Sequence, residues 1–176
     1  MPDVAPYIMM MIDPGTTVRP GAPEDTAATL DLVLASGLFG ADDIDPVVQL
    51  LGDYFTKPNL GHLYLVSANT TTVNAVAYAQ PNPAADRLWY LTMIAVHPDS
   101  QRSGSGTALL SAVESELLAR EQRLLLVETS ALPAYDSARQ FYRQAGYDEK
   151  ARVRDFHEDG DDMVLFRKRL LNRTVQ

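Results

Sequence analysis

The sequence predicts a domain of the α/β (α+β) class, because strand-like and helix-like patterns alternate along its 176 residues. Seven short runs are apolar, or alternate apolar with polar residues, and end near Gly, Pro, Asn or Asp, which is typical of strands. They are residues 16–19, 62–68, 72–80, 88–96, 123–129, 149–156 and 163–169. Four other segments carry apolar residues at helical spacing. They are residues 24–36, 46–55, 107–121 and 135–145.

The first part of the chain predicts an arm, a short strand and two helices. Residues 1–15 are rich in Pro and Met with little periodicity, so we expect a flexible arm followed by a single domain over residues 16–172. Gly37 ends the first helix, and Asp45 before a proline marks the start of the second. The apolar stripes are Ala27, Leu30, Val33 and Leu34 in the first helix and Val47, Leu50, Leu51 and Tyr54 in the second.

The remaining elements follow from shorter signals. Runs 62–68 and 72–80 predict a hairpin, because only three residues separate them. Run 123–129 is almost continuously apolar, which indicates a buried central strand. Gly146 ends the fourth helix, and the turn residues 158–161 join the last two strands. The apolar stripe of the fourth helix is Ala138, Phe141, Tyr142 and Ala145.

Composition excludes several classes of function. Hydrophobic residues make up 46% and charged residues 22%, as in ordinary soluble domains. The chain has no cysteine, which removes disulfides, thiolate metal ligands and a cysteine nucleophile, and suits a cytoplasmic protein. Its three histidines, His62, His97 and His157, lie far apart, so we expect no metal site. A net charge of −8 opposes nucleic-acid binding, and the early apolar run 7–12 is too short to span a membrane.

The most informative stretch is residues 91–110, where a strand-like run, a glycine-containing loop and a helix follow one another. Backbone N–H groups in such a loop and in the first helical turn lack intrahelical partners and favour a bound phosphate. Gly104 and Gly106 allow the backbone to approach an anion closely. A dinucleotide fingerprint would need a third glycine where Leu109 stands, and the lysine of a Walker loop is missing.

Two ordered motifs resemble those of the GCN5-related N-acetyltransferase (GNAT) superfamily. The first is Gln101-x-x-Gly104-x-Gly106, preceded by a Val-x-Pro strand end at residues 96–98. The second is residues 138–147, ARQFYRQAGY, which lies beyond the run 123–129 as the family's order requires. The resemblance implies a mixed, mostly antiparallel sheet of about seven strands with about four helices. It also implies transfer of an acetyl group from acetyl-CoA to a primary amine.

By the same resemblance, the backbone of the strand end contacts the pantetheine arm and the loop contacts the pyrophosphate. The implied cofactor-binding residues are Ile94, Ala95, Val96, Gln101, Arg102, Ser103, Gly104, Ser105, Gly106 and Thr107. Tyr135 stands where many relatives carry a coenzyme-binding asparagine, and we expect its hydroxyl to reach the cofactor. Ser137 and Arg139 on the same helix are expected near the adenosine end.

The resemblance places Tyr142 as the general acid, because a phenol there reaches the coenzyme sulfur in many relatives. A phenol is protonated at neutral pH and can give its proton to the departing thiolate. The family's usual glutamate on the strand before the loop is replaced by Tyr90. Glu128, near the end of a buried strand, is the remaining candidate, either as a desolvated base or as a partner for the substrate ammonium. His97 and a chain of water molecules are the alternatives to it.

Three interpretations therefore remain open. The first is an N-acetyltransferase, and the absence of cysteine favours direct attack in a ternary complex. The second is a non-catalytic acyl-CoA-binding sensor of the same fold, which the missing glutamate favours. The third is an unrelated nucleotide-binding protein. Family members often dimerise, so a homodimer stays an alternative to a monomer.

Overall fold

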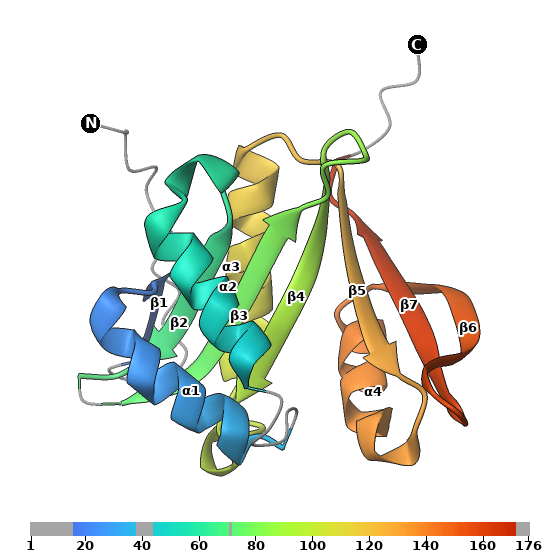
Figure 1. Ribbon diagram of the computed structural model, residues 1–176, viewed down its shortest axis with the longest axis horizontal. Coiled ribbons are helices and arrows are strands. Elements are labelled where there is room, and N and C mark those ends of the chain that lie inside the picture. Colours follow the sequence, from blue (N-terminus) through green and yellow to red (C-terminus); the bar gives the residue numbers. More distant parts are fainter. Residues whose placement is uncertain (1–15, 38–43, 71, 172–176) are drawn as a thin grey trace. The chain divides into compact units, whose positions relative to one another are not determined.

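Seven strands form one sheet in the order β1-β2-β3-β4-β5-β7-β6 (Figure 1). Neighbouring strands run antiparallel in the pairs β1–β2, β2–β3, β5–β7 and β6–β7, whereas β4–β5 is parallel. The prediction of a mixed, mostly antiparallel sheet is therefore confirmed. The strands are β1 (Thr17–Pro20), β2 (Leu63–Ala68), β3 (Val73–Pro81), β4 (Leu88–Val96), β5 (Leu124–Ser130), β6 (Asp148–Glu158) and β7 (Asp161–Arg169).

Within its described residues the chain also has the four expected α-helices. They are α1 (Thr26–Ala35), α2 (Asp45–Thr56), α3 (Ser105–Ala119) and α4 (Asp136–Gln144). Short 3-10 turns precede α1 and α4. None of the helices in these ranges is long and apolar enough to cross a bilayer.

This computed structural model describes residues 16–37, 44–70 and 72–171, and the predicted arm of residues 1–15 lies outside them. The chain divides into two units. Unit 1 contains the chain up to Gln80 together with Met93–Glu116, and unit 2 contains Pro81–Thr92 together with the chain from Leu117 onward. Strand β4 contributes residues to both units. The single domain over residues 16–172 remains a prediction.

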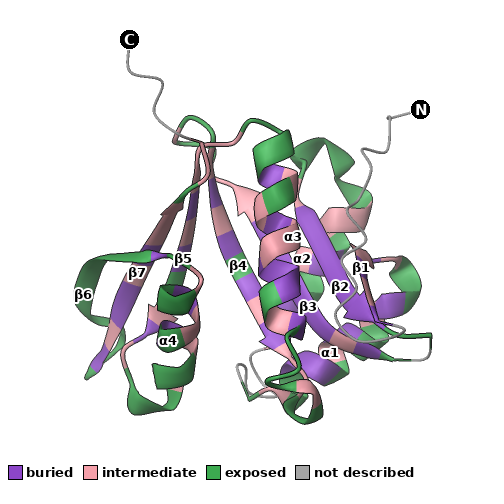
Figure 2. Ribbon diagram, turned by 180° about the vertical axis from the view of Figure 1, so that it is seen from behind, coloured by how far each residue is buried: buried purple, intermediate pink, exposed green. Residues whose placement is uncertain are grey.

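In unit 1 the strands β2 and β3 are buried over most of their length, with α1 and α2 on one face and α3 on the other (Figures 1 and 2). The predicted hairpin is confirmed, with Leu63 opposite Ala79 in antiparallel register. The tyrosines Tyr64 and Tyr78 are fully buried among aliphatic side chains of α1 and α2. Burial of aromatic and aliphatic side chains of this size supplies most of the stabilising free energy of such a unit.

The buried face of α1 differs from the predicted stripe. Thr29, Leu32 and Val33 are buried, whereas Ala27 and Leu34 are exposed. The reason is a polar contact, because the Oγ1 atom of Thr29 lies 2.6 Å from the Tyr64 hydroxyl. A buried phenol needs a hydrogen-bond partner, and Thr29 supplies it from inside the helix face.

Unit 2 is built on the strands β5, β6 and β7. Seven residue pairs join β5 to β7, from Leu124–Arg169 to Ser130–Met163. The predicted turn between β6 and β7 is confirmed, with Gly160 at a φ of 86° and Glu158 paired with Asp161. The outer strand β6 is exposed along its length (Figure 2).

Candidate active site

The glycine loop lies entirely in unit 1, between the end of β4 and the start of α3. The N–H group of His97 donates to the Asn74 carbonyl at 2.9 Å, which fixes the end of β4 against β3. A 3-10 turn over Pro98–Ser100 then leads into the loop. Residues 101–104, which form the loop itself, are all exposed.

Serine side chains hold the loop in one conformation. The Ser103 hydroxyl donates to the Ser100 carbonyl at 2.6 Å, so its oxygen is left to accept a proton from Ser105, 2.8 Å away. Two loop residues have positive φ values, 61° at Arg102 and 90° at Gly104. Glycine adopts this conformation without strain, which explains its position immediately before α3.

Helix α3 begins at Ser105, two residues before the predicted start at Thr107. The difference matters because Ser105, Gly106 and Thr107 now form the first helical turn. Their N–H groups have no acceptor inside the helix. Within the described chain, no group accepts a hydrogen bond from the N–H of Gly106 or of Thr107. The dipole of a 15-residue helix adds partial positive charge at this end. The loop and the helix start therefore offer a site for an anion such as a diphosphate.

The strand end before the loop has an alternating pattern of burial. Ala95 is buried and its neighbours Ile94 and Val96 are half-buried. The register between β4 and β5 extends only over three pairs and ends at Tyr90–Leu126. The contact of residues 94–96 with a pantetheine arm stays a prediction.

Tyr142 is buried in unit 2, on the inner side of α4. Its ring packs against Tyr147, with centroids 5.8 Å apart, and against Phe166 of β7 at 5.6 Å. Burial raises the pKa of the Tyr142 phenol above its ordinary value of 10. The phenol is therefore protonated over the physiological range, as a proton donor must be.

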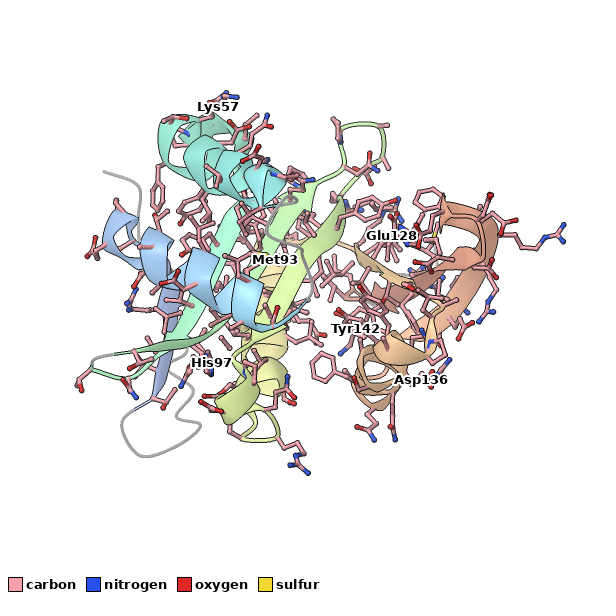
Figure 3. All side chains as sticks on the ribbon, turned by 60° about the horizontal axis from the view of Figure 1, so that its bottom comes forward. Lys57, Met93, His97, Glu128, Asp136 and Tyr142 are labelled. Carbon is pink, nitrogen blue, oxygen red and sulfur yellow. The ribbon has the colours of Figure 1, made fainter. Side chains whose placement is uncertain are left out.

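Glu128 also belongs to unit 2, where it lies on β5 (Figure 3). The expectation of a desolvated carboxylate is wrong, because Glu128 is exposed. The physical reason is the alternation along β5. Leu125 and Val127 point into the core, and the residues between them lie on the less covered face.

Tyr90 stands in place of the family's usual glutamate, and the sequence does not predict it as a site residue. The structure brings it to Glu128 and Asn82, all three within unit 2. Burial raises the pKa of Tyr90, and both the charge of Glu128 and hydrogen bonding to it raise this pKa further, whereas hydrogen bonding to Asn82 lowers it. The parallel pairing of β4 with β5 creates this contact, and no local sequence pattern marks it.

Other candidates have different roles. Arg139 is buried and donates to the carbonyls of Ser130 and Leu132, so the expectation that it lies at the adenosine of a coenzyme is wrong. The Nδ1 atom of His97 accepts from the Asp99 N–H at 3.3 Å, which makes it a cap of the turn before the loop. Tyr135 ends the 3-10 turn before α4 and is half-buried.

Metal ligands do not gather anywhere in the described ranges, since no group of three His, Asp or Glu side chains could hold an ion there.

A family model described as "Acetyltransferase (GNAT) domain" matches residues 59–149, which include the glycine loop and the whole second motif. The mixed, mostly antiparallel seven-stranded sheet, with the glycine loop between β4 and α3, is a GNAT-like α/β fold. The chain belongs to the GNAT acetyltransferase family. No curated protein matches the sequence.

Solved structures share this fold. A putative acetyltransferase of the GNAT family from Desulfovibrio desulfuricans is 28% identical, with a TM-score of 0.84 over 89% of this chain and 99% of that one. The ribosomal-protein-S18-alanine N-acetyltransferase of Escherichia coli is 20% identical, with a TM-score of 0.73 over 92% and 99%. A putative acetyltransferase from Salmonella typhimurium, solved with its cofactor acetyl-CoA, is 19% identical, with a TM-score of 0.73 over 92% and 97%.

Proposed function

We propose that this protein is an N-acetyltransferase that moves an acetyl group from acetyl-CoA to a primary amine by direct attack in a ternary complex. The observation that carries the proposal is the exposed loop of residues 101–104 with the open N–H groups of Gly106 and Thr107 behind it. In a chain of the GNAT family, this arrangement fits the diphosphate of coenzyme A.

The cofactor is held, in this proposal, mainly by the backbone. N–H groups between Gln101 and Thr107 donate to the diphosphate, and Arg102 adds a charge-assisted contact. The backbone of Ile94, Ala95 and Val96 binds the pantetheine arm, and Tyr135 contacts the coenzyme through its hydroxyl. Bound acetyl-CoA supplies, as a thioester, the acetyl group that is transferred.

The chemistry then needs a neutral amine as nucleophile and a proton for the leaving sulfur. As the amine nitrogen bonds to the acetyl carbon, the carbon–sulfur bond breaks and its electron pair stays on sulfur. Tyr142 gives its proton to that sulfur, which releases a neutral thiol. Glu128 holds the acceptor ammonium, which loses one proton to water before the attack, because only the neutral amine has a free electron pair. The nitrogen loses a second proton to water as the amide forms, and the Tyr142 phenolate takes a proton back from water.

The printed names of similar structures differ in acceptor, since one is a ribosomal-protein-S18-alanine N-acetyltransferase and another an aminoglycoside 6'-N-acetyltransferase. The deciding experiment is therefore a thiol-release assay with acetyl-CoA against a library of polyamines, amino acids, aminoglycosides and peptides with free N-termini. We expect thiol release that depends on one class of amine and falls about 10²-fold in Tyr142→Phe. Binding of acetyl-CoA by the wild type without turnover on any amine would contradict the proposal and favour an acyl-CoA sensor.

A further inference from the structure

Three polar side chains of unit 2 lie on one face of its strands. Tyr90 of β4 pairs with Leu126 of β5 in parallel register, and Glu128 lies two residues further along β5. Because side chains two residues apart on a strand share a face, Tyr90, Leu126 and Glu128 point to the same side. Thr92, two residues beyond Tyr90, is exposed on this side as well. This face therefore combines a phenol, a hydroxyl and a carboxylate at the place where β4 and β5 stop pairing.

The hydrogen bonds among Asn82, Tyr90 and Glu128 show which side chain donates to which. The N–H group of Ala84 donates to the Asn82 side-chain oxygen at 2.8 Å, so the Asn82 amide nitrogen faces away as a donor. Hydrogen bonding to Asn82 lowers the pKa of Tyr90, which is the effect of a donor to the phenol oxygen. Hydrogen bonding to Glu128 raises the pKa of Tyr90, which is the effect of an acceptor of the phenol proton. Asn82 therefore donates to the Tyr90 hydroxyl oxygen, and the Tyr90 hydroxyl donates to Glu128.

We propose that Tyr90 is a positioning residue that holds one oxygen of Glu128 and turns the other toward the ammonium group of a cationic acceptor, with Asn82 fixing the phenol from behind. This inference rests on the proposed function, because it names the acceptor class of the same site. In this inference, Tyr90 and Glu128 together occupy the part of the site where the family's usual glutamate is missing.

The chemistry of the group selects for a positively charged primary amine. An exposed carboxylate on a flexible side chain spends little time in one geometry, and a phenol that occupies one oxygen restricts its rotamers. The second oxygen then accepts from an N⁺–H group, which is a stronger hydrogen bond than one between neutral partners. A neutral or anionic acceptor would gain nothing from Glu128.

The first test observes the group without any turnover. A fluorinated tyrosine at position 90, whose phenol ionises near neutral pH, is titrated by ¹⁹F NMR in the full chain. Replacing Glu128 with Gln should lower the pKa of this phenol, because a negative acceptor is lost, and Asn82→Ala should raise it, because a donor is lost. Equal titration curves in all three proteins would overturn the inference, whether or not the protein is an enzyme.

The second test uses kinetics with the best cationic amine. Tyr90→Phe should raise KM for the amine about tenfold while KM for acetyl-CoA stays unchanged, because only the acceptor is held by the pair. In the Glu128→Ala background the same change should have no further effect. Tyr64→Phe, which removes a buried hydroxyl contact to Thr29, serves as a matched control that lowers stability and leaves KM unchanged.

The outcomes separate the two proposals. If the wild type turns over no amine but the fluorotyrosine shifts appear, the acetyltransferase proposal fails and the hydrogen bond between Tyr90 and Glu128 stands. If amines are acetylated and Tyr90→Phe and Glu128→Ala have additive effects on KM, the positioning role is wrong and the proposed function stands.

Discussion

The Nδ1 atom of His62 lies 2.7 Å from the hydroxyl oxygen of Tyr78. The same hydroxyl donates its only proton to the Leu50 carbonyl of α2 at 2.8 Å. Nδ1 of His62 must therefore carry a proton and donate it, which leaves Nε2 as the unprotonated nitrogen of a neutral ring. This chain of two bonds ties the start of β2 to β3 and to α2, all within unit 1.

The first prediction concerns pH and stability. Burial lowers the pKa of His62 below its ordinary value of 6.5, so the unfolded chain binds this proton more readily than the folded one. Stability should be independent of this group above pH 6.5 and should fall as the pH drops through the window between 6.5 and the folded-state value. Thermal unfolding of the wild type and of His62→Asn, which keeps a donor near Nδ1 but cannot titrate, should diverge only below that pH. Parallel curves would assign the acid sensitivity to other groups.

The second prediction concerns the loop glycine. Gly104 has a φ of 90°, so Gly104→Ala should strain the loop by about 1–2 kcal/mol and weaken acetyl-CoA binding about tenfold. Calorimetric titration measures the effect. Gly52→Ala is the matched control, because Gly52 lies inside α2 with open space around it and should gain about 0.5–1 kcal/mol of stability with unchanged binding. Equal affinities in wild type and Gly104→Ala would show that the loop conformation does not matter for the coenzyme.

The third prediction concerns Tyr142. Removal of its hydroxyl should lower kcat about 10²-fold and leave the Kd for acetyl-CoA unchanged, because a general acid acts only as the thiol leaves. Since burial raises the pKa of this phenol, its deprotonation should not limit turnover below pH 10. Stopped assays of Tyr142→Phe across pH 6–10 check both points. A kcat within twofold of the wild type would remove Tyr142 from the mechanism.

The fourth prediction concerns Arg139, which is buried and binds two backbone carbonyls and Asp136. Arg139→Lys should cost about 2 kcal/mol of stability, because a lysine lacks the planar guanidinium with which Arg139 reaches all three acceptors. Its affinity for acetyl-CoA should be that of the wild type once the protein is folded. A selective loss of coenzyme affinity with an unchanged melting temperature would restore the cofactor role expected from the sequence.

The elements themselves were predictable, because their signals are local. The β4 strand has the predicted bounds, and the turn at Gly160 and the stop at Gly146 lie where glycine with positive φ is needed. The faces of α1 and α4 were less predictable. Thr29 and Arg139 are polar residues that become buried because partners on other elements satisfy them.

In the candidate site too, features with a local sequence signal could be predicted, and contacts between distant segments could not. The glycine loop could be identified from spacing, although the helix begins earlier than its apolar pattern indicates. The contact of Tyr90 with Glu128 and Asn82 depends on strand register between segments almost 40 residues apart, which a pattern along the sequence does not contain. The exposure of Glu128 has the same origin, since it follows from which face of β5 is covered.

The central claim is that amides at the start of α3 bind the diphosphate of acetyl-CoA. An NMR titration of ¹⁵N-labelled protein with acetyl-CoA tests it most directly. The amide resonances of Gly104, Gly106 and Thr107 should shift together and saturate at the Kd measured by calorimetry. Saturable binding of acetyl-CoA that leaves these three resonances in place would contradict the account.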